Sequence, residues 1–149
     1  MKVTTCLLKD VFQTAEQMRR LTENYWSDLG GWLDVPFFVF FDYVCSLPYV
    51  ADPIEVETVS RPKFTLNPEY IPRDCDDKAV LLASWWYGHG VPVRFIASST
   101  RRNKTLHHTF IQLGNGLILD ATYPEYTDLL GNYPYYSRLT KLQPLTNFF

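Results

Sequence analysis

Hydrophobic spacing divides the chain into a helical first half and a strand-rich second half. From Lys9 to Tyr25, apolar residues recur at three- and four-residue steps, which is the spacing of an amphipathic helix. Gly30-Gly31 then breaks the pattern. Asp34 occupies an N-cap position and Pro36 a first-turn position before the apolar run Phe37–Cys45, which predicts a second, mostly buried helix.

A proline-rich connector follows this second helix. Prolines fix φ and restrict the residue before them, so the segment is predicted to be extended and irregular. Loops longer than about 12 to 15 residues are usually functional when they are ordered. We therefore expect the connector to border the functional site, anchored by the apolar residues Tyr49, Phe64, Tyr70 and Ile71.

The next run, Cys75–Tyr87, is apolar on nearly every side, which is typical of a helix enclosed by other elements. Gly88-His89-Gly90 is predicted to end it. Strand patterns then cover Val91–Ala97, Leu106–Leu113 and Leu117–Ala121. A polar, basic turn (Ser98–Lys104) separates the first two strands, Gly114-Asn115-Gly116 forms the hairpin between the last two, and an edge strand is predicted near Tyr136–Leu142.

These elements predict an α+β fold, in which a central helix that carries Cys75 packs on an antiparallel sheet that carries His108 and Asp120. The 149 residues are enough for one domain with one core. We expect a single domain over 1–149, with N-terminal helices at 9–46, a catalytic core at 49–124 and a C-terminal edge strand and tail at 125–149.

Charge and cysteine content narrow the function classes. The net charge of -2 gives no electrostatic reason to expect a nucleic acid or an anionic membrane as partner. The longest apolar run is Val35–Phe41, far short of the roughly 20 residues that span a bilayer, and Met1–Asp10 has no signal-peptide pattern. Three cysteines in dissimilar surroundings do not form a disulfide framework, so we expect a cytoplasmic protein.

The order Cys75, His107-His108, Asp120 is a thiol-nucleophile pattern. A thiol attacks as thiolate, and a cysteine in the first turn of a helix gains from the unpaired amides and the helix dipole, while an imidazole can take its proton. The neighbouring Asp74 and Asp77 fit a capping box, with Asp74 as N-cap. Cys6, Cys45 and His89 have the surroundings of ordinary structural residues.

The choice between the two histidines depends on the hairpin register, which the sequence alone leaves open. If the turn is a three-residue loop with a left-handed Gly116, Leu113 pairs with Leu117, and Asp120 lies diagonal to His108 on one face. A two-residue Asn-Gly turn would place Asp120 on the face of His107 instead. We prefer His108, for which a family resemblance supplies a second reason. Metal binding is disfavoured because the spacing of zinc ligands is absent, so no metal or other cofactor is predicted.

Four ordered blocks resemble the transglutaminase-like superfamily, which shares the papain-like cysteine peptidase fold, and in particular its short bacterial and phage-borne members. The blocks cover about half of the chain, from Tyr49 to Pro124, and the segments that carry the likeness are Arg73-Asp74-Cys75-Asp76-Asp77-Lys78-Ala79, Gly90-Val91-Pro92-Val93-Arg94-Phe95, His108-Thr109-Phe110-Ile111 and Leu117-Ile118-Leu119-Asp120.

The resemblance implies Cys75 as nucleophile, His108 as base and Asp120 as the group that orients the imidazole. It departs from the family at Arg73, where a glycine is common, and in lacking an upstream glutamine to serve as oxyanion donor. Tyr49 is a candidate for that second donor beside the Cys75 amide.

The function predicted from the sequence is a thiol-dependent hydrolase that cleaves a peptide or side-chain amide bond through a thioester, with a peptide or protein as substrate. The alternatives are an acyltransferase that passes the acyl group to an amine, and a non-catalytic binding or assembly module on the same fold.

Overall fold

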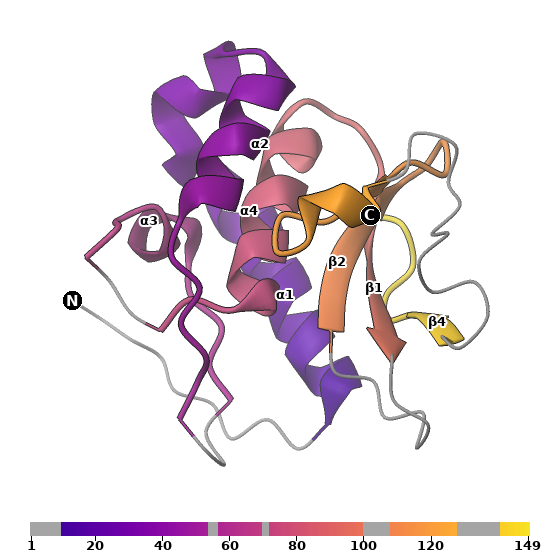
Figure 1. Ribbon diagram of the computed structural model, residues 1–149. Helices are drawn as coiled ribbons and strands as arrows, with labels where there is room; N and C mark the ends of the chain where they lie inside the picture. The colour runs from indigo at the N-terminus through magenta and orange to yellow at the C-terminus, as the bar shows by residue number, and fades with distance from the viewer. Residues whose placement is uncertain (1–9, 54–56, 70–71, 100–107, 128–140) are drawn as a thin grey trace.

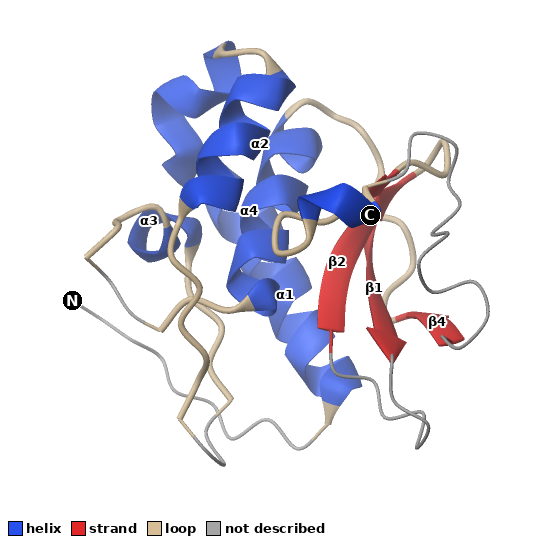
Figure 2. Ribbon diagram, in the orientation of Figure 1, coloured by secondary structure: helices blue, strands red, loops and turns tan. Residues whose placement is uncertain are grey.

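A computed structural model describes residues 10–53, 57–69, 72–99, 108–127 and 141–149. Helices gather on one side and a four-stranded antiparallel sheet lies on the other, which is the α+β arrangement that the sequence predicts (Figures 1 and 2). In the described ranges, no helix combines the length and the apolar character needed to cross a bilayer.

The first predicted helix is confirmed as α1 (Val11–Tyr25), which begins where the Asp10 side chain accepts a hydrogen bond from the Gln13 amide. Its buried face consists of Thr14, Ala15, Met18, Leu21 and Thr22. The 3-10 segment η1 (Trp26–Asp34) continues from it and kinks at Gly30, whose φ of 53° favours glycine.

The second helix, α2 (Phe37–Ser46), forms where predicted, but two expectations about it are wrong. Its N-cap is Pro36, with no side-chain cap, so Asp34 does not cap it. It is also not mostly buried, since only Phe40 and Val44 are buried and Phe38 is 67% exposed. The apolar run Phe37–Cys45 extends around the whole circumference of the helix, but the rest of the described chain covers only the face that carries Phe40 and Val44.

The connector is mostly irregular, as predicted, and it borders the N-terminus of the cysteine-bearing helix. A short helix, α3 (Pro62–Thr65), was not predicted; it begins with Pro62, whose fixed φ suits a first helical turn. An isolated antiparallel bridge joins Val50 to Arg73, so the two ends of the connector meet. Of its predicted anchors, Tyr70 and Ile71 lie outside the described residues.

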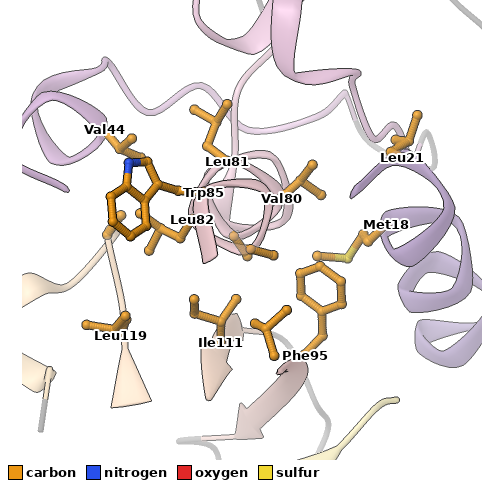
Figure 3. Packing of buried hydrophobic residues seen from close by; sticks show 14 of the residues in the cluster. Met18, Leu21, Val44, Val80, Leu81, Leu82, Trp85, Phe95, Ile111 and Leu119 are labelled. Atoms are coloured by element: carbon orange, nitrogen blue, oxygen red, sulfur yellow. The ribbon is translucent and has the colours of Figure 1, made fainter. Parts of the chain in front are cut away.

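Helix α4 (Cys75–Gly88) is the centre of the fold, and its first eleven residues are all buried. Figure 3 shows α4 nearly end-on: Met18 and Leu21 of α1 lie on one side of it, Val44 of α2 on another, and strand side chains below. A helix enclosed in this way needs apolar residues around its whole circumference, which explains its lack of amphipathic pattern. The predicted stop is confirmed, because α4 ends at Gly88.

The strands β1 (Val93–Ser99), β2 (His108–Leu113), β3 (Ile118–Leu119) and β4 (Lys141–Pro144) lie in the order β3-β2-β1-β4. The predicted edge strand is therefore confirmed for its last residues; the rest of Tyr136–Leu142, like the basic turn from residue 100 and His107, lies outside the described chain. Phe95 and Ile111 face α4, whereas Ile96, Phe110 and Ile118 form a second, small cluster.

The hairpin between β2 and β3 has the register that was preferred from sequence. Ile111 pairs with Leu119 and Gln112 with Ile118. The Leu113 amide donates to the Leu117 carbonyl at 2.9 Å, and Gly116 has a φ of 95°. The three-residue loop is thus confirmed, and it places His108 and Asp120 diagonally across the two strands.

Candidate active site around Cys75, His108 and Asp120

The N-terminus of α4 is held by the predicted capping box, which is confirmed. The Asp74 side chain accepts from the amides of Asp76 and Asp77, and the Asp77 side chain accepts from the Asp74 amide at 3.1 Å. Asp77 also accepts from the Ser60 amide at 2.8 Å, which ties the connector to the helix. Burial raises the pKa of both carboxyls, and the backbone amides oppose that rise.

Cys75 is the first residue of α4, and its side chain is buried, with 8% of the residue exposed. Burial is the main reason that the pKa of its thiol lies well above the usual value, and the carboxylates of Asp76 and Asp74 raise it further. A hydrogen bond from the Thr109 backbone amide acts in the opposite direction. The resting cysteine is therefore a neutral thiol, and the lowering of its pKa expected from the helix N-terminus is outweighed.

The Thr109 amide faces the thiol because of how the hairpin ends. Leu113 directs its N–H toward β3, and alternate residues of an antiparallel strand repeat that direction, so Ile111 and Thr109 do the same. Strand β3 ends at Leu119, before it reaches the position opposite Thr109. The amide that would have continued the ladder instead faces the sulfur of Cys75.

The Cys75 thiol donates a hydrogen bond to the Asp76 carboxyl, with 4.0 Å between Sγ and Oδ1. Asp76 also forms side-chain hydrogen bonds with Glu57 of the connector and with Thr109. Two carboxyls can bond to each other only if one carries a proton. The pKa of Glu57 is accordingly raised to about 8, mainly by burial and by that bond to Asp76. Sequence reasoning noted Asp76 but not Glu57, since no local pattern joins them.

His108 and Asp120 meet as predicted. Nε2 of His108 lies 2.6 Å from Oδ2 of Asp120, and both residues are buried, with 5% and 1% exposed. The other carboxylate oxygen, Oδ1, accepts from the backbone amides of Thr122 and Tyr123, each at 3.0 Å. With its second oxygen held in this way, Asp120 fixes the imidazole and leaves Nδ1 as the ring nitrogen that is not bonded to the carboxylate.

The structure does not join all three predicted residues by hydrogen bonds. Among the described residues, no hydrogen bond connects the Cys75 thiol to the His108 ring. Strand alternation places Thr109 on the face that packs against α4, whereas His108 lies on the face of Phe110, whose ring is 5.7 Å away between centroids. The sulfur nevertheless faces the peptide amide that directly follows His108, and it lies within electrostatic reach of Asp120, the carboxylate bonded to that ring.

Two tyrosines lie beside this group. Tyr123 packs edge-on against His108, with 4.9 Å between ring centroids, and is 42% exposed. Tyr49 is 51% exposed, and its electrostatic neighbours are Cys75, Asp74, Asp76 and Tyr123. Burial of its hydroxyl and these negative charges raise the pKa of Tyr49, so the hydroxyl stays a proton donor. Its role as oxyanion donor remains a prediction.

Arg73, which stands where the resembled family often has glycine, is fully buried, with 0% exposed. Its guanidinium donates to the carbonyls of Thr65, Pro48 and Asn67 at 3.0, 3.2 and 2.5 Å. The side chain points into the connector and binds its backbone. Arg73 therefore joins the start of the connector at Pro48 to its later part at Thr65 and Asn67, a role that only the folded connector reveals.

The remaining candidates have structural surroundings. Cys45 is half-buried and burial raises its pKa to about 11, and Cys6 lies outside the described residues. His89 stacks on Trp85 with 3.8 Å between centroids, and Trp85 donates to the Trp32 carbonyl. No three His, Cys, Asp or Glu side chains in the described ranges are grouped so that they could hold a metal ion.

In comparisons with known proteins, no family model, no curated protein and no solved structure matches the chain.

Proposed function

We propose that this protein is a thiol-dependent hydrolase with a papain-like, transglutaminase-like core, which cleaves a peptide or side-chain amide bond. The observation that carries the proposal is the buried pair of His108 and Asp120, joined at 2.6 Å beside the only cysteine that begins a helix in the described chain. A buried imidazole fixed by a carboxylate, with a thiol next to it, is the arrangement of an activated nucleophile.

The reaction uses these side chains in sequence. Nε2–H of His108 donates to Asp120, so Nδ1 takes the proton of the Cys75 thiol. The thiolate forms a bond to the substrate carbonyl carbon, the C–N bond breaks, and the imidazolium returns the proton to the leaving nitrogen. Water, deprotonated by the same ring, then attacks the thioester and releases the acid and the thiol.

Approach of the imidazole to the sulfur is a required step. Catalytic hydrogen bonds are often long in the free enzyme and shorten in the complex with substrate. The sulfur already lies against the amide of Thr109, and we infer that a local shift of the end of β2, which keeps His108 bonded to Asp120, closes the remaining distance. The same approach also occurs in a small fraction of the free molecules, so the reactivity of Cys75 depends on His108 before a substrate binds, while the raised pKa keeps most of the thiol neutral.

The test is the alkylation of Cys75 by iodoacetamide at neutral pH, measured by mass spectrometry with Cys45 of the same molecule as internal reference. His108→Ala should slow the alkylation of Cys75 at least about tenfold, because one pKa unit changes the thiolate fraction by that factor. The rate at Cys45 should not change. Equal rates at Cys75 in both proteins would refute the role of His108.

The reaction type is tested with a mixture of unfolded proteins as substrate. Hydrolysis produces new termini or deamidated side chains with the wild type and none with Cys75→Ala. Incorporation of an added primary amine in place of water would show acyl transfer instead. A Cys75→Ala variant indistinguishable from the wild type in both assays would contradict the enzymatic proposal.

A further inference from the structure

Acidic groups gather at the N-terminus of α4. Asp74, Asp76, Asp120 and Tyr49 act on the Cys75 thiol, and Asp52, Glu57 and Asp77 lie around Asp76. Most are committed to backbone amides or to the imidazole. Asp76 differs, because its carboxyl lies 4.0 Å from the sulfur and its other partners are side chains.

The connector holds Glu57 in position to meet Asp76. Both oxygens of Asp52 accept from Thr58, from its amide and from its hydroxyl, each at 2.6 Å. The Ser60 amide donates to Asp77 at 2.8 Å. The residues that directly follow Glu57 are thus bound to Asp52 and to α4, which holds the Glu57 carboxyl beside Asp76.

We propose that Asp76, bonded to Glu57 through a shared proton, is a positioning residue that sets the pH at which the Cys75 thiol becomes reactive. The proposal rests on the function proposed above. A carboxylate at this distance opposes formation of a thiolate, whereas a neutral side chain does not. The hydroxyl of Thr109, whose amide faces the sulfur, also bonds Asp76, so one strand residue connects the carboxyl pair to the thiol.

The negative charge on the Asp76–Glu57 pair increases in two steps as the pH rises. Asp76 has a pKa raised to about 6 and Glu57 one raised to about 8, in both cases chiefly by burial. Between these values the pair carries one negative charge and one proton, and above about 8 it carries two charges. The second charge should hold back the thiolate just where a free thiol would begin to ionise, near pH 8.5, at about its reference pKa.

The experiment measures the alkylation rate of Cys75 by iodoacetamide from pH 5 to pH 10 in the wild type, Asp76→Asn and Glu57→Gln. Asp76→Asn keeps the size and hydrogen bonding of the side chain but removes the charge, so the midpoint of the curve should fall by at least about one pKa unit. Glu57→Gln can still donate to Asp76 but cannot become the second charge. Its curve should follow the wild type below about pH 8 and lie above it at higher pH.

Glu16→Gln, which removes an exposed carboxylate from α1, is the matched control and should reproduce the wild-type curve. An unchanged or higher midpoint in Asp76→Asn would overturn the proposal, as would a Glu57→Gln curve identical to the wild type above pH 8. A variant whose fold is only loosened would also expose Cys45, so a faster alkylation of Cys45 would identify it. Failure of the proposed function is separate, since it appears as an absent effect of His108→Ala.

Discussion

Replacement of Arg73 by methionine tests whether this buried cation holds the connector around the thiol. Methionine keeps much of the length and apolar stem of arginine but cannot donate. Three carbonyls, those of Thr65, Pro48 and Asn67, lose their guanidinium partner in the variant. Unlike a surface ion pair, this group is closed off from water, with 0% of the residue exposed, so water cannot take its place without opening the connector.

The magnitude follows from these contacts. A hydrogen bond to a charged group contributes about 1.5 to 3 kcal/mol, and a buried acceptor left unsatisfied costs about 1 to 3 kcal/mol. Two of the three bonds are partly buried, so partial rehydration lowers the sum. We expect Arg73→Met to reduce the free energy of unfolding by about 3 to 5 kcal/mol, a large share of the roughly 5 to 15 kcal/mol of a typical domain.

Urea unfolding followed by circular dichroism measures this loss, with Arg20→Met as control. Arg20 is exposed on α1 and has one ion pair, 3.6 Å from Glu16, so its replacement should change stability by less than about 1 kcal/mol. Alkylation of Cys75 in native buffer should also rise in Arg73→Met, because the loosened connector no longer covers the thiol. A loss below about 1 kcal/mol in Arg73→Met, equal to the control, would refute the reasoning.

Two further predictions concern the carboxyl pair and the hairpin. Glu57 has a pKa of about 8 in the folded protein against a usual 4.5, so the folded state binds a proton that the unfolded state releases. The free energy of unfolding therefore falls as the pH rises from about 5 to about 8. The melting temperature should be lower at pH 9 than at pH 6, and Glu57→Gln should reduce that difference. A melting temperature that rises over this range would contradict it. Gly116 has a φ of 95°, so Gly116→Ala should lower the free energy of unfolding in urea by about 1 to 2 kcal/mol. Gly114→Ala in the same turn, whose added Cβ would meet Pro92 at an ordinary 3.6 Å, should lower it by less. Equal losses would show that backbone strain at Gly116 is not the cause.

Local patterns predicted the parts of the site that local chemistry determines. The capping box of Asp74 and Asp77 needs only neighbours in sequence, and the hairpin register follows from a turn of three residues with glycine in the left-handed position. That register, together with the family resemblance, led to the choice of His108 over its neighbour, and the bond to Asp120 agrees with the choice.

Apart from the cap that Asp34 does not form, the features that sequence reasoning missed depend on segments distant in sequence. The exposure of Phe38 on α2 depends on which elements cover that helix, and the enclosure of Arg73 depends on a folded connector. The state of the thiol is a balance: the helix N-terminus and the Thr109 amide favour the anion, but burial and Asp76 oppose it more strongly. Sequence names each of these groups without giving their distances.

The enclosure of α4 by other elements decides which partner in the proposed reaction can move. Packed side chains from α1, α2 and the sheet surround this helix (Figure 3), and such an interior resists displacement by even small amounts. The packing consequently holds Cys75, the first residue of α4, in its position. Any adjustment that substrate binding requires must therefore come from the sheet, through movement of the bonded pair of His108 and Asp120, and not from a shift of the nucleophile.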